Sequence, residues 1–137
     1  MESKVNEALG LFKEGFSCSQ AIFAPYAKEF DMDYEMALKV SQGFGGGMGG
    51  MRGECGAITG AYMVIGLIYG RTRADDNAAR IKTFTMVKDF AKRFKQIHNT
   101  TVCKELLQGK SGSHYNMCSD YVKDACIVLE QLLEEYK

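Results

Sequence analysis

Apolar residues recur every three or four positions along almost the whole chain, and no stretch alternates apolar and polar residues as a half-buried strand would. Proline, which interrupts helices, occurs once, whereas Ala, Leu, Glu, Lys and Met are abundant. This pattern predicts an all-α fold, a compact bundle of about five to seven helices. No repeat or long linker divides the 137 residues, so we expect a single helical domain over residues 1–137.

Capping residues and glycines set the expected helix limits. Ser17 and Asp33 are typical N-cap residues, and glycines such as Gly15 and Gly43 end helices. Pro25 should kink or break the second helix. The predicted helices span residues 5–13, 18–30, 34–41, 54–69, 75–98, 100–107 and 117–135.

The stretch from Ala57 to Tyr69 is the most hydrophobic part of the chain. It is shorter than the ~20 residues that a bilayer span needs, so we expect a central buried helix and no stable membrane insertion. Gly56 and Gly60 lie on one side of it and would let a neighbouring backbone approach closely. The long helix over 75–98 is expected to pack on it through one apolar side: Ile81, Phe84, Val87, Phe90, Ala91 and Phe94.

The balance of acidic and basic residues bears on which partners the chain can bind. Seventeen basic and seventeen acidic residues leave no net charge, and no segment concentrates Lys and Arg, so nucleic-acid binding is not expected. The first residues lack the apolar run of a signal peptide, which favours a cytoplasmic location. In the reducing cytosol, five cysteines would be thiols, metal ligands or transient catalytic disulfides.

Four of the five cysteines share one kind of position. Cys18, Cys55, Cys103 and Cys118 each fall at or near the start of a predicted helix. A helix N-terminus offers free N–H groups and the positive end of the helix dipole, which together stabilise a thiolate. We therefore predict that these four converge on one site, with Cys18–Cys55 and Cys103–Cys118 as the expected pairs. Cys126 falls in mid-helix and is expected to pack in the core.

The glycine-rich segment, residues 43–53, precedes the central helix. Gly45, Gly47 and Gly50 match a dinucleotide-binding spacing, but a helix precedes them where that motif needs a strand. Two interpretations of this segment stay open. In the first, it is a flexible loop whose backbone N–H groups form a nest that binds a thiolate or a small anion. In the second, it is a loop that crosses close to packed helices. In the first interpretation, the loop leaves Cys55 accessible and the charge of nearby Arg52 favours its thiolate, so we expect Cys55 to be the strongest nucleophile.

Histidines and metal ligation offer further candidates. His98 and His114 precede Cys103 and Cys118 by five and four residues, and both are candidate ligands or proton donors. His98 also lies at the C-terminal end of a predicted helix, where the helix dipole by itself favours a histidine. Structural zinc sites usually bring cysteines in close pairs, and none of these cysteines is close to another in sequence. A metal or iron–sulfur cluster held by dispersed helices stays possible.

The run Gly53-Glu54-Cys55-Gly56-Ala57-Ile58-Thr59-Gly60, with lone cysteines before and after it, resembles the C_GCAxxG_C_C family of redox-active proteins. The resemblance covers nearly the whole chain. It implies that the family's cysteines fall on Cys18, Cys55, Cys103 and Cys118, and it leaves Cys126 outside the pattern. It implies redox activity but names no substrate and no cofactor.

We therefore expect thiol–disulfide or related redox chemistry, with an oxidoreductase activity open, at Cys18, Cys55, Cys103 and Cys118. One alternative is a metal or iron–sulfur protein that uses the same four cysteines. Another is a non-catalytic protein that binds a small molecule or anion at the glycine-rich loop. The sequence identifies no cofactor, redox partner or oligomeric state.

Overall fold

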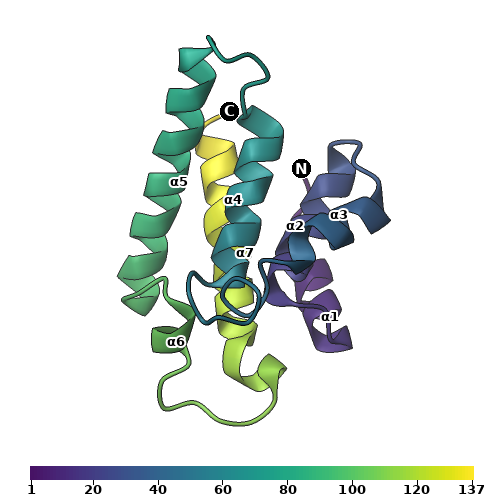
Figure 1. The fold of residues 1–137 in the computed structure, drawn as a ribbon, viewed down its shortest axis with the longest axis vertical. Helices are drawn as coiled ribbons and strands as arrows, with labels where there is room; N and C mark the ends of the chain where they lie inside the picture. The colour runs from purple at the N-terminus through teal and green to yellow at the C-terminus, as the bar shows by residue number, and fades with distance from the viewer.

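The computed structural model describes all of residues 1–137, and its regular structure is helical, with no sheet. It therefore confirms the all-α prediction. Figure 1 shows long helices standing side by side, with shorter ones at one flank and one end. In chain order they are α1 (Val5–Glu14), α2 (Cys18–Glu29), α3 (Tyr34–Gln42), α4 (Gly56–Tyr69), α5 (Asn77–His98), α6 (Cys103–Leu106) and α7 (His114–Glu135).

Helix α4 is the centre of the bundle, as its apolar sequence predicts. It contacts α2, α5 and α7, and its first six residues are all buried (Figure 1). A Cβ atom on Gly60 would lie 2.9 Å from the Ser19 carbonyl oxygen and 3.0 Å from Ile22 Cβ, so α2 packs against α4 almost backbone to backbone. None of the helices is both long enough and apolar enough to cross a membrane.

Helix α2 is unbroken at Pro25, where the sequence predicted a kink or a break. The expected break is absent, and a single helix runs from Cys18 to Glu29 with Pro25 inside it. Every residue from Cys18 to Ala27 is buried, because α1, α3, α4 and α7 all pack against this helix. Burial on all sides stabilises the helix and offsets the hydrogen bond that proline cannot donate.

Helix α5 packs on α4 as predicted, but its buried face is rotated from the expected one. The buried residues are Thr83, Met86, Phe90 and Phe94. Ile81 and Phe84, predicted to face the core, are 59% and 51% exposed. Phe90 meets Tyr62 of α4 edge to face, with ring centroids 5.7 Å apart, which fixes the rotation of α5 about its axis.

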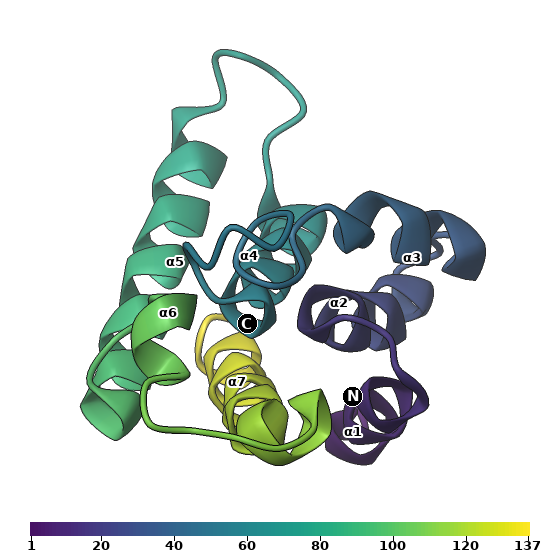
Figure 2. The same cartoon turned by 60° about the horizontal axis from the view of Figure 1, so that its bottom comes forward.

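The glycine-rich segment and α6 lie together at one end of the bundle, where α2, α4 and α7 begin (Figure 2). The only strand-like pairing is an isolated antiparallel bridge between Glu54 and Val102. This bridge ties the segment before α4 to the segment before α6. It therefore places two of the singled-out cysteines, Cys55 and Cys103, on neighbouring backbone segments.

Candidate thiol site

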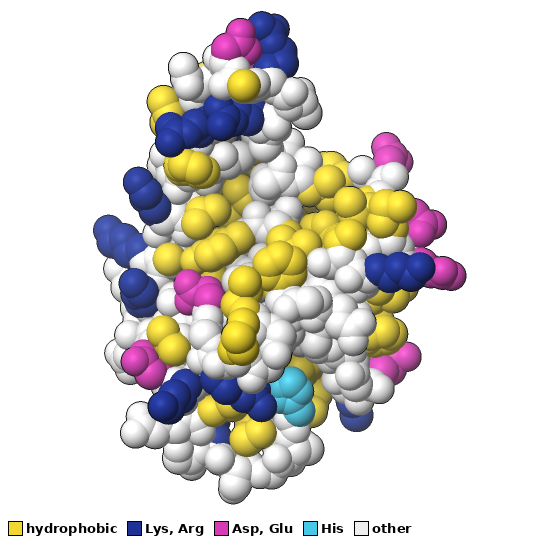
Figure 3. All heavy atoms as spheres, in the orientation of Figure 1, with side chains coloured by type: hydrophobic (Ala, Val, Ile, Leu, Met, Phe, Trp, Pro, Cys, Tyr) yellow, Lys and Arg dark blue, Asp and Glu magenta, His cyan; other side chains and the backbone are white.

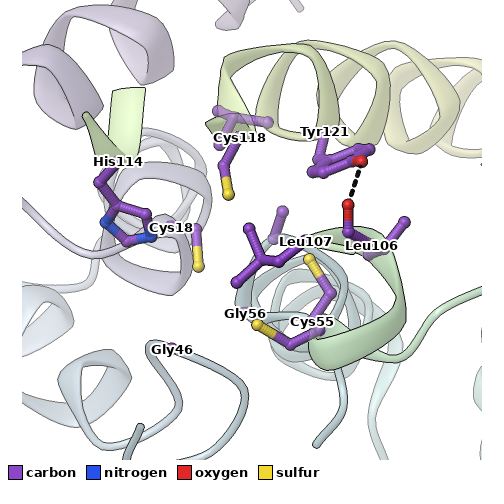
Figure 4. Close-up of a pocket in the computed structure, with 12 residues that line it drawn as sticks. Cys18, Gly46, Cys55, Gly56, Leu106, Leu107, His114, Cys118 and Tyr121 are labelled. Carbon is purple, nitrogen blue, oxygen red and sulfur yellow. Dashed lines mark hydrogen bonds between the residues drawn. The ribbon is translucent and has the colours of Figure 1, made fainter. Parts of the chain in front are cut away.

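The four cysteines that the sequence singled out line one cavity. Cys18, Cys55, Cys103 and Cys118 share it with His114 and Tyr121, and all five cysteines of the chain are free thiols. Figure 4 shows Cys18 of α2, Cys55 just before α4 and Cys118 of α7 around the same hollow. The cavity has a free volume of about 10 Å³, room for about one water molecule.

Cys18 is the first residue of α2 and is positioned by a capping box. The Ser17 N–H donates to the Gln20 side-chain oxygen at 3.0 Å, which fixes the start of the helix. The missing side chain of Gly56 makes room for the thiol, since a Cβ there would lie 2.4 Å from Cys18 Sγ. Gly56 thus lets the start of α4 approach the start of α2.

Cys55 and Cys103 are joined through the bridge between their segments. The Cys55 N–H donates to the Thr101 carbonyl at 2.9 Å, and the Cys103 N–H donates to the Gly53 carbonyl at 2.6 Å. In an antiparallel pair, this register puts residues 55 and 103 on the same face as diagonal neighbours, a spacing of about 7–8 Å between Cα atoms and less between side chains. The pairing therefore places Cys103 near Cys55, while Cys18 Sγ lies beside Gly56, the residue that follows Cys55.

Cys118 does not lie in the first turn of its helix as predicted. The helix starts earlier, at His114, because Ser113 caps it by accepting a hydrogen bond from the Asn116 N–H at 3.1 Å. Cys118 is then the fifth residue of α7, beyond the free N–H groups of the helix start. Three of the four cysteines remain at helix starts, with Cys55 as the N-cap of α4.

Burial, more than helix position, sets the acidity of most of these thiols. It raises the pKa of Cys18 and of Cys55, and it raises the pKa of Cys118 to about 11. The Ala57 and Ile58 N–H groups lower the Cys55 pKa, as a helix start should, but by less than burial raises it. The prediction that Cys55 carries a lowered pKa is wrong, because α2 and the segment before α6 cover it.

Arg52 faces a different cysteine from the predicted one. Its Nη1 donates a hydrogen bond to Cys103 Sγ at 3.8 Å, and no corresponding contact reaches Cys55. A guanidinium beside a sulfur stabilises the thiolate form. Helix α6 is only four residues long, and Arg52 is the cationic side chain that contacts the Cys103 sulfur.

The glycine-rich loop is held by its own backbone. The Gly50, Arg52 and Gly53 N–H groups donate to carbonyls five or six residues earlier, at 2.8–3.0 Å. A Cβ on Gly47 would lie 2.7 Å from both Cys103 Cβ and the Arg52 Cα. The segment is therefore a tight loop packed against the site. This supports the interpretation as a loop that crosses close to packed helices over that of a flexible anion-binding nest.

The two histidines occupy different places. His114 lines the cavity near Cys18 (Figure 4), and partial desolvation together with the nearby Arg52 charge lowers the pKa of its imidazole. His98 lies outside the cavity. Its Nε2 pairs with Asp124 at 2.8 Å, and its ring packs on Phe94 and Tyr121, which is a structural role.

The thiols do not form a ready metal site. No group of three or more His, Cys, Asp and Glu side chains is arranged to hold a metal ion. The cavity, with room for about one water, would also have to expand to admit a cluster. The arrangement as it stands does not fit the metal alternative.

Cys126 lies apart from the cavity, fully buried in mid-helix, in the position expected of a packing residue. Sequence reasoning missed Tyr121 and Leu107, which also line the cavity. The Tyr121 hydroxyl donates to the Leu106 carbonyl at 2.6 Å and so fastens α6 to α7. A tyrosine at helical spacing looks like any core residue, so no local pattern marks it.

One family model matches most of the chain. The family model C_GCAxxG_C_C, described as "Putative redox-active protein", matches residues 16–132, a stretch that contains all four cavity cysteines. No curated protein and no solved structure matches the chain.

Proposed function

The chain belongs to the C_GCAxxG_C_C family, whose description supports a redox role, and we propose that it is a thiol–disulfide redox protein of the cytoplasm. In this proposal Cys103 is the attacking thiol and Cys55 resolves the mixed disulfide. Cys18 and Cys118 are the second dithiol of the same cavity. The observation that carries the proposal is the convergence of four free thiols on one cavity, with Arg52 on Cys103.

The assignment of Cys103 as the attacking thiol depends on charge. A thiolate, not a thiol, attacks a disulfide, and a neighbouring cation increases the thiolate fraction. Cys103 is the cysteine to which a cationic side chain donates a hydrogen bond, whereas burial raises the pKa of Cys18, Cys55 and Cys118. Cys103 should therefore react first.

The assignment of Cys55 as the resolving thiol depends on the bridge between residues 53–55 and 101–103. Cys55 and Cys103 lie on one face of this pairing, and the segments that carry them must draw together to bring the two Cα atoms within the ~7 Å that a disulfide spans. A raised pKa suits a resolving thiol, because it stays protonated until Cys103 is engaged in a disulfide. The expected product is a Cys55–Cys103 disulfide.

The reaction balances as two exchange steps. The Cys103 thiolate attacks one sulfur of a disulfide R–S–S–R, forming a Cys103 mixed disulfide and releasing one thiolate R–S⁻. Cys55 then loses its proton to solvent and attacks Cys103 Sγ, releasing the second R–S⁻. The protein dithiol is oxidised and the substrate disulfide is reduced to two thiols.

The test uses the full chain and a neutral reagent, bis(2-hydroxyethyl) disulfide. Reduced protein is oxidised under argon, the remaining thiols are alkylated, and peptides are mapped by mass spectrometry. We expect a Cys55–Cys103 linkage, loss of this linkage in Cys103→Ser, and an accumulated Cys103 mixed disulfide in Cys55→Ser. Cys126→Ser is the control and should be oxidised like the wild type.

Two results would contradict the proposal. The first is random oxidation, in which Cys126 forms mixed disulfides as fast as Cys103. The second is visible absorbance with bound metal in protein purified without oxygen, which would make the cavity a metal or cluster site. Far-ultraviolet circular dichroism of each variant checks that it is folded.

A further inference from the structure

A groove on the surface opens next to the cysteine cavity. It has a volume of about 520 Å³ and is lined by Arg52, Lys104, Glu105, Leu107 and Gln108. Leu107 is half-buried and lines both the groove and the cavity, so its side chain lies between the two. The groove is therefore one approach from solvent toward Cys103.

The charges along this groove are unbalanced. Arg52 and Lys104 are exposed, and neither forms an ion pair with any carboxylate of the chain, although seven such pairs exist elsewhere. The one acidic residue, Glu105, accepts a hydrogen bond from the Thr100 hydroxyl. In Figure 3, Lys and Arg side chains border apolar atoms at this end of the molecule, around α6.

The backbone holds the two cations next to each other. The Lys104 N–H donates to the Arg52 carbonyl at 3.1 Å, directly beside the pairing that joins Gly53 and Cys103. Arg52 also contacts the Cys103 sulfur, so the same guanidinium faces the groove and the reacting atom. A carboxylate bound between Arg52 and Lys104 would therefore carry its own sulfur close to Cys103.

Resting on the proposed function, we infer that the groove binds small disulfides that carry carboxylates, and that Arg52 and Lys104 recognise the carboxylate. Leu107 moves aside to admit the disulfide. The steps are those given above: Cys103 bonds to the nearer sulfur, one carboxylate-bearing thiolate leaves, and Cys55 releases the second. The substrate supplies the oxidising disulfide, so no other reactant is needed.

The test compares two disulfides of similar length that differ in charge: 3,3′-dithiodipropionate, which carries two carboxylates, and neutral bis(2-hydroxyethyl) disulfide. The quantity measured is the ratio of their rates of Cys103 oxidation, anionic over neutral, which cancels the intrinsic reactivity of the protein thiol. In Lys104→Gln we expect this ratio to fall about threefold at low ionic strength, the usual size of one exposed charge interaction. It should also fall in the wild type near 1 M salt, where the Debye length is about 3 Å.

A matched control exists in a groove that no cysteine lines. A second groove of about 520 Å³ on α5 is lined by Lys88, Lys92 and Lys95, away from all cysteines. Lys95→Gln removes the same charge from the chain and should leave the ratio unchanged. An equal ratio in wild type, Lys104→Gln and Lys95→Gln would overturn the inference. If the neutral disulfide itself fails to oxidise Cys103, the proposed function falls, which is a distinct result.

Discussion

Arg52 Nη1 lies 3.8 Å from Cys103 Sγ, although 51 positions separate the two residues in the chain. Arg52 has a left-handed backbone, with φ of 63°, and its N–H donates to the Gly46 carbonyl at 3.0 Å. Its own carbonyl accepts from the Lys104 N–H. The glycine-rich loop thus holds the Arg52 guanidinium against Cys103, which directly follows the bridge residue Val102. This arrangement predicts that Cys103 is the most reactive thiol.

Arg52→Gln should slow the reaction of Cys103 with iodoacetamide at pH 7 by about fivefold, because one thiolate-stabilising charge worth about 1 kcal/mol is lost. Alkylation of reduced protein followed by peptide mass spectrometry measures the rate at each cysteine. Arg71→Gln is the control, since Arg71 is exposed in the 70–76 linker and should leave all five rates unchanged. Equal Cys103 rates in Arg52→Gln and wild type would show that the charge does not act on this thiol.

Gly56→Ala should destabilise the protein by about 1–3 kcal/mol, the usual effect of overpacking a tight contact. The new Cβ would lie 2.4 Å from Cys18 Sγ and 3.2 Å from the Phe44 carbonyl oxygen, so the start of α4 must move. Urea unfolding followed by circular dichroism measures the change.

Gly66→Ala provides the comparison in the same helix. Gly66 is exposed and nothing lies within 4 Å of a Cβ built there, so alanine should stabilise α4 by about 0.5–1 kcal/mol. Opposite signs for the two glycines are expected. If both variants gained stability, the close approach of Cys18 to α4 would be absent in solution.

Local sequence predicted most of the helices because caps and periodicity are local signals. Ser17 and Asp33 start α2 and α3 where expected, and the apolar run made α4 central. The start of α7 was missed because Ser113 stands in a polar stretch that looked like a loop. Its role as an N-cap is visible only in the structure, where the Ser113 hydroxyl accepts a hydrogen bond from the Asn116 N–H.

The pairing of segments far apart in the chain could not be predicted from the sequence. The bridge of Glu54 with Val102 joins segments 48 residues apart without any strand pattern, and it sets which cysteine lies beside which. The same contacts bury Cys55 and direct Arg52 to Cys103. The grouping of the four cysteines was predicted from helix starts, a position that the structure gives to Cys18, Cys55 and Cys103 but not to Cys118. The individual acidity of the thiols depends on neighbours from distant helices.

Stability should fall as pH rises above about 9, and Cys126 should account for part of the fall. Burial raises the pKa of Cys126 from 9.0 to about 12, so the folded thiol keeps its proton at a pH where the unfolded thiol has lost it. The stabilisation is fully present below pH 9 and is lost between about pH 9 and 12. The slope from this group is at most about 1.4 kcal/mol per pH unit.

Urea unfolding with a phosphine reductant, from pH 8 to 10.5, tests this. Cys126→Ala lowers stability at every pH, through the lost sulfur, but its curve should be flatter than that of the wild type above pH 9. Lysines, and tyrosines other than Tyr26, which neighbours Cys126, titrate in both proteins and cancel in the difference. Parallel curves would mean that Cys126 titrates alike in the folded and unfolded chain.

Tyr121→Phe should cost about 1–2 kcal/mol and loosen α6. The Tyr121 hydroxyl donates to the Leu106 carbonyl at 2.6 Å in a buried position, and its loss leaves that acceptor without its partner. Because Cys103 begins α6 and Leu107 follows its last turn, the freed helix should open the wall between groove and cavity more often. We therefore expect faster alkylation of Cys103 and Cys118 together with a lower urea midpoint. Tyr115→Phe in the same helix is the control, as its hydroxyl makes no hydrogen bond within the protein, and a matching rise in its Cys103 rate would contradict this role for Tyr121.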